Sequence, residues 1–225
     1  STQGYSSAAS DVYKRQPLYV EEKSIMYLMA RAAKQAGTPA IRTSSIRDVI
    51  AIKEETGLPV IGLVKIQYPG YEGYITPTMK EVDDLVAAGS DVVALDCTLR
   101  KRGDGITVNE FIAQIKEKYP DIILMADISN YEEGINAWKC GVDIVGTTMS
   151  GYTDYTSKKD EPDYELMERL AKDTDIPVIG EGKIHYPDQA VKALQTGVWA
   201  IVVGGAITRP LEIAQRFQKA IEAGK

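Results

Sequence analysis

The sequence has few cysteines, one histidine and no excess of positive charge. Only two cysteines occur in 225 residues, and they form no CxxC pair. This excludes a disulfide-stapled scaffold and predicts a reducing compartment, most simply the cytoplasm. Lysine and arginine number 26 against 32 aspartate and glutamate residues, a net charge of −6. Because binding to a nucleic-acid backbone needs a basic surface, this balance argues against a nucleic-acid partner.

Membrane, export and nucleotide-binding signals are also missing. No apolar run approaches the roughly 18 residues that cross a membrane, and residues 1–10 lack the charged and apolar regions of a secretory signal. No dinucleotide-binding fingerprint or Walker motif occurs, so no nucleotide cofactor is implied. The lone His185 has no second histidine as a metal partner, and we expect it on the surface or in a loop. The remaining composition, 44% hydrophobic and 26% charged, is typical of one globular domain.

From residue 24 onward, short apolar runs alternate with longer stretches whose apolar residues recur every three or four positions. This pattern predicts repeated βα units and a parallel sheet. The expected helices cover residues 24–35, 46–56, 78–88, 107–118, 131–139, 163–172, 187–195 and 211–223. The expected strands cover residues 39–42, 59–65, 91–96, 122–127, 143–147, 177–181 and 199–204.

Several expected helices end at a glycine, where a left-handed backbone costs little. These glycines are Gly37, Gly89, Gly141 and Gly197. The repetition of helix, glycine and strand favours one repeating architecture. Eight helices with seven strands fit a (β/α)8 TIM barrel better than a doubly wound sheet, which carries fewer units and is the alternative.

The beginning of the chain does not fit this pattern. Residues 1–16 show no apolar alternation where a barrel needs its first strand. They resemble either non-native residues from a tag or a misassembled read, or a native arm without structure. We expect a single barrel domain over residues 17–225 with its first strand missing or replaced. A missing strand would leave unpaired edges between the second and eighth strands, which dimerisation or the tail itself would cover.

In a βα barrel the active site forms where the strands end. Polar residues close the apolar runs at Arg42, Lys65, Asp96, Asp127, Thr147, Thr148 and Glu181. Any buried strand also needs a polar end, so single positions carry less weight than the joint pattern of two cations and three carboxylates. Burial would lower the pKa of Lys65 and suit it to act as a base. Burial would raise the pKa of Glu181, whereas a salt bridge to Lys65 would lower it, so the two would titrate as a coupled pair.

A glycine pair, Gly204 and Gly205, follows the last expected strand shortly before a helix. Backbone N–H groups there, with Gly182 in the preceding loop, can cradle a phosphate; the bland alternative is a turn. The basic run at residues 100–102 is either a phosphate grip or a solvated loop. The tyrosine-containing stretch at residues 68–74 is either a lid or a packed surface loop.

Eight motifs occur in order along the strand ends. They are AIR at residues 40–42, IGLVK at 61–65, YITPT at 74–78, ALD at 94–96, MADIS at 125–129, TTMSGYT at 147–153, EGKI at 181–184 and VGGAITRP at 203–210. Together they resemble the N-acetylmannosamine-6-phosphate 2-epimerase family from about Pro17 to the end of the chain. The resemblance implies a phosphate-binding TIM barrel and a homodimer. It also implies cofactor-independent interconversion of N-acetylmannosamine 6-phosphate and N-acetylglucosamine 6-phosphate, a step in sialic acid breakdown.

The resemblance also implies roles for particular residues. The catalytic lysine and glutamate of the family fall on Lys65 and Glu181, and its substrate-contacting arginine and aspartate fall on Arg42 and Asp127. Arg209 matches the arginine of the family's ITRP segment. Phosphate contacts would come from the backbone of Gly182, Gly204 and Gly205.

Three departures separate this chain from the family pattern. The family's first strand carries a Ser-Cys-Gln-type segment with a glutamine in the site, and residues 1–16 do not reproduce it; Gln16 is too close to the matched segment. Thr43 and Ile66 stand where the family often has alanine and arginine. Two alternatives therefore stay open: an aldolase or synthase that forms a Schiff base on a barrel lysine, and a non-catalytic barrel that binds a sugar phosphate.

Overall fold

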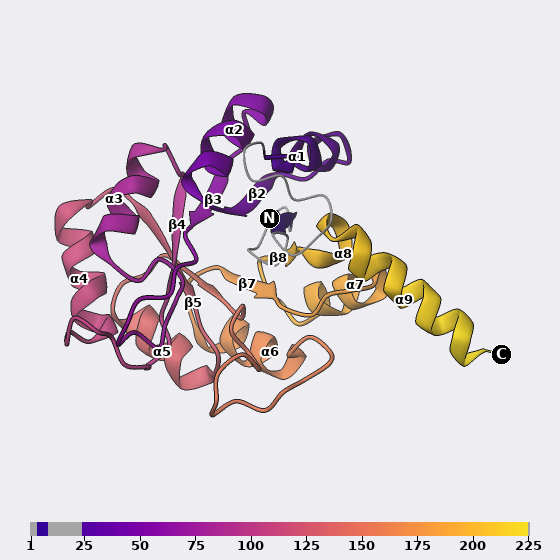
Figure 1. Cartoon of the computed structure of the whole chain (residues 1–225). Helices are drawn as coiled ribbons and strands as arrows, with labels where there is room; N and C mark the ends of the chain where they lie inside the picture. The colour runs from indigo at the N-terminus through magenta and orange to yellow at the C-terminus, as the bar shows by residue number, and fades with distance from the viewer. Residues whose placement is uncertain (1–3, 9–23, 225) are drawn as a thin grey trace.

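The alternating apolar runs and helical stretches fold into a closed barrel of eight parallel strands with helices around it (Figure 1). This computed structural model describes residues 24–224 with their side chains and residues 4–8 by their backbone. The strands follow one another around the barrel in chain order from β1 to β8. The TIM-barrel prediction is confirmed, and the doubly wound alternative is wrong.

The strands are β1 Gly4–Ala8, β2 Ala40–Ser44, β3 Val60–Leu63, β4 Val92–Asp96, β5 Ile123–Asp127, β6 Ile144–Gly146, β7 Val178–Glu181 and β8 Ala200–Val203. The helices are α1 Met26–Gln35, α2 Ile46–Thr56, α3 Met79–Ala87, α4 Val108–Lys118, α5 Tyr131–Lys139, α6 Tyr164–Asp173, α7 Pro187–Gln195, α8 Gly205–Thr208 and α9 Pro210–Ala223. Each predicted element is present within two residues of its expected bounds. The short helix α8 was not predicted.

The segment Gly4–Ala8 occupies the position of the first strand. It pairs in parallel with both neighbours, so that Ser6 lies opposite Ala40 of β2 and Val202 of β8. The expectation of unpaired edges between the second and eighth strands is therefore wrong. A ladder needs only backbone N–H and C=O groups, which any residue but proline supplies, so an apolar pattern does not reveal such a strand. The expected domain boundary at Pro17 lies outside the described residues.

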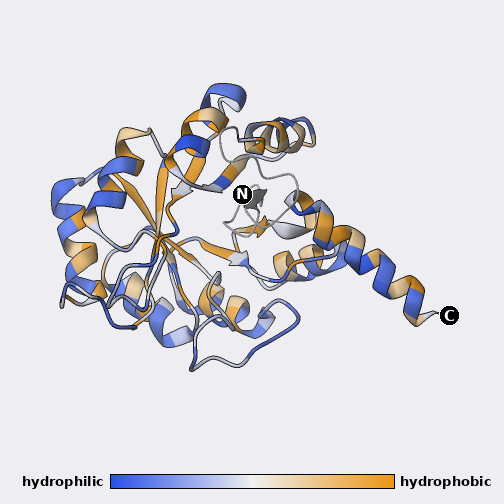
Figure 2. Ribbon diagram, viewed as in Figure 1, coloured by the Kyte–Doolittle hydropathy of each residue, from blue (hydrophilic) through white to orange (hydrophobic). Residues whose placement is uncertain are grey.

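Two apolar clusters make up the core. One lies between the strands and the helices that cover them. The other fills the barrel interior and consists of Ile61, Leu63, Ile75, Val92, Ala94, Met125, Met149, Ile179, Ala200 and Val202. Figure 2 shows the apolar strands inside and the polar helix faces outside. A barrel filled in this way presents its polar residues only where the strands end.

The helix ends follow the glycine prediction. The backbones of four glycines are left-handed, with φ of 91° at Gly37, 78° at Gly89, 87° at Gly141 and 93° at Gly197. Each of these glycines lets the chain turn from a helix towards the next strand without strain.

The last helix, α9, extends away from the barrel (Figure 1). None of its residues is buried, although its sequence has the apolar spacing of an amphipathic helix. Leu211, Phe217 and Ile221 are exposed to 38%, 70% and 54%. Within the described part of the chain, no helix is long and apolar enough to span a membrane.

Candidate active site

The barrel brings four predicted charged residues to the carboxyl ends of its strands. Arg42 lies in β2, Asp127 ends β5, Glu181 ends β7, and Lys65 follows β3. The closed strand order places these ends around one mouth. Residues that are far apart in the sequence therefore share one site, as the strand-end pattern predicts.

Arg42 is the largest fully buried side chain among the described residues. Its Nη2 donates to Asp127 Oδ2 at 2.7 Å, its Nε lies 3.1 Å from Glu181 Oε2, and its Nη1 contacts Met125 Sδ at 3.2 Å. An unpaired buried charge is costly, so the two carboxylates are what make this position tolerable. Burial lowers the pKa of Arg42, but Asp127 and Glu181 together outweigh burial and the pKa is raised.

Glu181 has a raised pKa. Burial is the main cause and repulsion from Asp127 adds to it, while Arg42 and Lys65 act in the opposite direction. The Arg42 guanidinium is close but not aligned as a donor, so Glu181 Oε2 has no hydrogen-bond partner among the described residues. The backbone of Glu181 is fixed by Thr147, whose Oγ1 donates to its carbonyl at 2.8 Å and accepts from its N–H at 3.0 Å. A buried carboxyl with a perturbed pKa is typical of a functional site.

Lys65 lies where the chain leaves β3 and enters the loop of residues 66–74. It forms an antiparallel bridge with Ile75, and Thr76 N–H donates to the carbonyl of Val64 at 2.6 Å. Thr76 adopts a left-handed φ of 47°, which is uncommon for a β-branched residue, and its hydroxyl donates to Ala94 O at 2.7 Å. Thr76 thus links the end of this loop to β4. The bridge to Ile75 and the hydrogen bond between Thr76 and Val64 fix the backbone around Lys65.

A cavity of about 200 Å³ opens between these strand ends. Lys65 and Glu181 line it together with three side chains from neighbouring loops, Tyr74, Thr148 and Met149. Arg42 and Asp127 do not line this cavity; Arg42 is linked to it through its ion pair with Glu181.

The predicted phosphate-binding residues Gly182, Gly204 and Gly205 line the same cavity, and so does Arg209, which was predicted to bind substrate. Gly182 has a left-handed φ of 112°, and Gly204 precedes the first turn of α8. Arg209 lies where α8 meets α9, and its Nη1 donates to Glu212 Oε1 at 3.1 Å. Three glycines and an arginine therefore line the space that Lys65 and Glu181 also line.

Only one of the two loops whose roles the sequence left open, residues 68–74 and residues 100–102, lines the cavity. In the 68–74 stretch, Tyr74 lines the cavity, whereas Tyr68 packs outside and donates to Glu81 at 2.8 Å. The basic run 100–102 does not line the cavity. Arg100 pairs with Asp96 at 2.6 Å, and the Arg102 guanidinium lies 4.0 Å from the ring centre of Phe111. Arg100 and Arg102 are thus engaged in packing and ion pairing, and a phosphate grip by this run is not supported.

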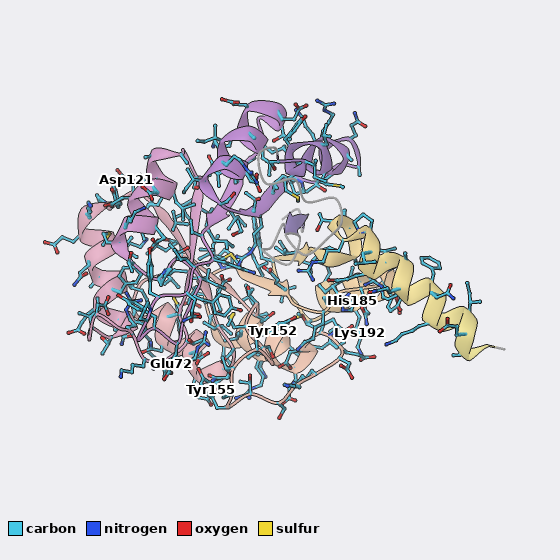
Figure 3. All side chains as sticks on the ribbon, viewed as in Figure 1. Glu72, Asp121, Tyr152, Tyr155, His185 and Lys192 are labelled. Atoms are coloured by element: carbon cyan, nitrogen blue, oxygen red, sulfur yellow. The ribbon has the colours of Figure 1, made fainter. Side chains whose placement is uncertain are left out.

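Sequence reasoning missed three residues of the cavity wall. Tyr152 and His185, labelled in Figure 3, and Lys183 come from the loops after β6 and β7. The Lys183 ammonium donates to Ser150 O at 3.0 Å and lies 4.9 Å from the centre of the Tyr152 ring. His185 is in a loop as expected, but it is half-buried, and burial lowers its pKa. All three follow a predicted strand end by a few residues, which is the signal that could have identified them.

No group of three or more histidine, cysteine, aspartate or glutamate side chains within the described residues is arranged to hold a metal ion. The charged side chains of the site instead pair with one another, as Arg42 does with Asp127 and Glu181.

Comparisons with known proteins agree with this geometry. A sequence profile described as "Putative N-acetylmannosamine-6-phosphate epimerase" matches residues 26–223. The chain is 55% identical over 193 residues to a "Putative N-acetylmannosamine-6-phosphate 2-epimerase" of Caldanaerobacter subterraneus, covering 86% of this chain and 81% of the relative. A protein of the same name from Clostridioides difficile is 50% identical over 198 residues, with 88% of each chain covered.

Two solved structures extend the comparison. The N-acetylmannosamine-6-phosphate 2-epimerase from Clostridium perfringens has a TM-score of 0.88 and 45% sequence identity, covering 96% of this chain and 93% of that one. A thiamine phosphate pyrophosphorylase from Pyrococcus furiosus has a TM-score of 0.61 at 20% identity, covering 98% and 96%, and supports the fold alone. The profile match over most of the chain and the identity to several relatives show that this chain belongs to the N-acetylmannosamine-6-phosphate epimerase family.

Proposed function

We propose that this chain interconverts N-acetylmannosamine 6-phosphate and N-acetylglucosamine 6-phosphate, an isomerase step in amino-sugar breakdown. The names of its relatives support this substrate class. One structural observation carries the proposal: Lys65 and Glu181 line one cavity with Gly204, Gly205 and Arg209. The residues that we assign to proton transfer and to anion binding therefore line the same small space.

Epimerisation at C2 needs a proton to leave and return. In the open-chain sugar the C2 proton is next to the C1 carbonyl, so its removal leaves an enolate that the site must stabilise. We assign Lys65 to removing and returning this proton and Glu181 to exchanging a proton with Lys65. The raised pKa of Glu181 supports this role, because a proton carrier works best when its pKa is near the working pH. Return of the proton to the opposite face of C2 inverts this centre without a change of oxidation state, so the proposed reaction uses no cofactor.

The remaining predicted residues are assigned to holding the substrate. We assign Arg42 and Asp127 to orienting the sugar, since their ion pair adjoins the Glu181 carboxyl. We assign the phosphoryl group to the backbone of Gly182, Gly204 and Gly205 and to Arg209. Glycine backbones admit close approach, and a guanidinium matches phosphate geometry.

Deuterium exchange tests the proposal directly. The protein is incubated with N-acetylmannosamine 6-phosphate in heavy water, and the C2 proton is followed by NMR. Loss of the C2 proton signal with appearance of the gluco epimer is the expected result. Absence of exchange by a protein with a cooperative thermal transition would contradict the proposed function.

We also propose that the chain forms a homodimer. The apolar residues Leu211, Phe217 and Ile221 of α9 are exposed, and an apolar helix face in water favours association. Light scattering after gel filtration is expected to give twice the chain mass. Phe217→Glu, which puts a charge on this face, is expected to shift the protein towards the monomer. A wild-type monomer at micromolar concentration contradicts the proposal.

The barrel formed by Gly4–Ala8 and residues 24–224 is proposed as the catalytic domain, and the cytoplasm is proposed as its compartment. The free thiols of Cys97 and Cys140 support a reducing environment. The sugar phosphate is the proposed partner, with no nucleic-acid or membrane partner, and the net charge of −6 supports this.

A further inference from the structure

The end of β6 contacts the Asp127 carboxylate and the backbone of Glu181. Gly146 is followed by two threonines, and Thr147 fixes the backbone of Glu181. The side-chain hydroxyl of Thr148, Oγ1, donates to Asp127 Oδ1 at 2.6 Å. Asp127 in turn repels the Glu181 carboxylate and contributes to its raised pKa. Thr148 thus binds one of the two acids and also lines the cavity.

Asp127 depends on this hydroxyl. Its side chain is fully buried, with Oδ2 bound to Arg42 and Oδ1 bound to Thr148, so both oxygens are used. A Cβ at Gly146 would lie 3.3 Å from Thr148 Oγ1 and 3.6 Å from Asp127 Oδ1. The glycine therefore leaves room for the Thr148–Asp127 hydrogen bond, and removing the hydroxyl would leave a buried carboxylate oxygen without a donor.

We propose that Thr148 is a positioning residue that holds the Asp127 carboxylate in place beside the Arg42–Glu181 pair for proton transfer. This inference rests on the proposed epimerase function and adds a residue to it. The charged groups that face Glu181 are Arg42, Asp127 and Lys65. Lys65 and Glu181 share one proton in the working state, so activity falls on the acid side when the pair takes up a second proton. The Thr148 hydroxyl donates to Asp127 and reduces the repulsion of Asp127 on Glu181, so it delays this uptake to lower pH.

Three variants separate the hydroxyl from the rest of the side chain. Thr148→Val keeps the shape and removes the hydroxyl, and Thr148→Ser keeps the hydroxyl and removes the methyl group. Thr196→Val makes the same chemical change at the end of α7, where the hydroxyl donates to Ala193 O. For each variant kcat, KM and the pH profile of C2 exchange are measured, and Thr148→Ala replaces the valine variant if that variant does not fold.

Thr148→Val is expected to lose about 10–100-fold in kcat, the cost of a hydrogen bond to a charged group. Its KM is expected to stay within about threefold, and the acid limb of its pH profile is expected to rise by about 0.5–1 pH unit. Thr148→Ser and Thr196→Val are expected to behave like the wild type. The proposal is overturned if Thr148→Val keeps wild-type kcat and acid limb. It is also overturned if Thr148→Ser and Thr148→Val both lose activity while the acid limb of the pH profile stays in place, because that result indicates a loss of side-chain packing.

A titration that does not depend on turnover keeps this inference separate from the proposed function. Carboxyl NMR of protein labelled with ¹³C at glutamate follows Glu181, assigned by the signal that disappears in Glu181→Gln. The Glu181 midpoint is expected to rise in Thr148→Val and not in Thr148→Ser. An unmoved midpoint refutes the role of Thr148, whereas an inactive wild type refutes only the epimerase function.

Discussion

Replacing Asp127 with asparagine removes one of the two negative charges that neutralise Arg42 and preserves the side-chain shape. The Arg42–Asp127 pair has an N–O distance of 2.7 Å, and the two side chains are 2% and 0% exposed. Removing one partner of a buried pair costs about 3–5 kcal/mol. Because Glu181 Oε2 is still 3.1 Å from Arg42, we expect the lower end, about 3 kcal/mol. For a chain of this length, that is a fall in Tm of about 6–12 °C.

Asp127→Asn is also expected to shift the pH dependence of activity in one direction. Repulsion from Asp127 contributes to the raised pKa of Glu181. Asparagine removes this repulsion and leaves Arg42 to Glu181 alone, so the pKa of Glu181 falls and the acid limb of activity moves to lower pH. This shift is opposite to the one expected for Thr148→Val.

Urea denaturation and the pH profile of C2 exchange test both effects. Asp84→Asn is the matched control, because Asp84 pairs with Lys80 on the helix surface at 2.6 Å, where ion pairs contribute little. If Asp127→Asn is no less stable than Asp84→Asn, or if its acid limb moves upward, the account of the buried network is refuted.

Four further predictions address the site and the barrel. Because the pKa of Glu181 is raised, the folded protein binds this proton more tightly than the unfolded chain does. This binding stabilises the fold fully below the unfolded pKa of about 4.3. The stabilisation is lost as the pH rises through the pKa of the folded state. Glu181→Gln, which imitates the protonated form, is therefore expected to melt above the wild type at pH 7 and to lose C2 exchange; retained exchange contradicts its role. Borohydride added with substrate is expected to trap no adduct on Lys65, and mass spectrometry showing one would favour the Schiff-base aldolase. Gly146→Ala places a Cβ 2.3 Å from Met125 Cε, and chemical denaturation is expected to show a loss of about 1–3 kcal/mol, reduced where Met125 can shift. Replacing residues 1–16 by a strand of the family's glutamine-bearing type is expected to raise kcat, and an unchanged rate argues against a role for that glutamine.

The sequence predicted the barrel and its charged centre because both follow from local patterns. Apolar periodicity locates the strands, and the rule that active sites form at strand ends identifies Arg42, Asp127 and Glu181 before any contact is known. Their pairing is observed in the structure at 2.7 and 3.1 Å. The catalytic and binding roles of these residues stay predictions.

The first strand and the loop residues could not be predicted in the same way. Gly4–Ala8 is placed by backbone pairing with β2 and β8, which leaves no mark in hydropathy. Tyr152 and Lys183 reach the cavity through the paths of two loops, and the left-handed φ of 59° at Lys183 has no sequence signature. The exposed face of α9 was also missed, because an amphipathic sequence does not tell what it packs against.

The buried Arg42 has a consequence for the order in which the barrel assembles. Its partners are 85 residues away in β5 and further still in β7, so no fragment that stops at β4 can neutralise this charge inside a core. A chain cut after β4 is expected to leave Arg42 exposed to solvent and to form no closed core. A chain that extends through β5 can bury the guanidinium against Asp127. Arg42 thus also sets the smallest piece of this protein that can close around its own interior.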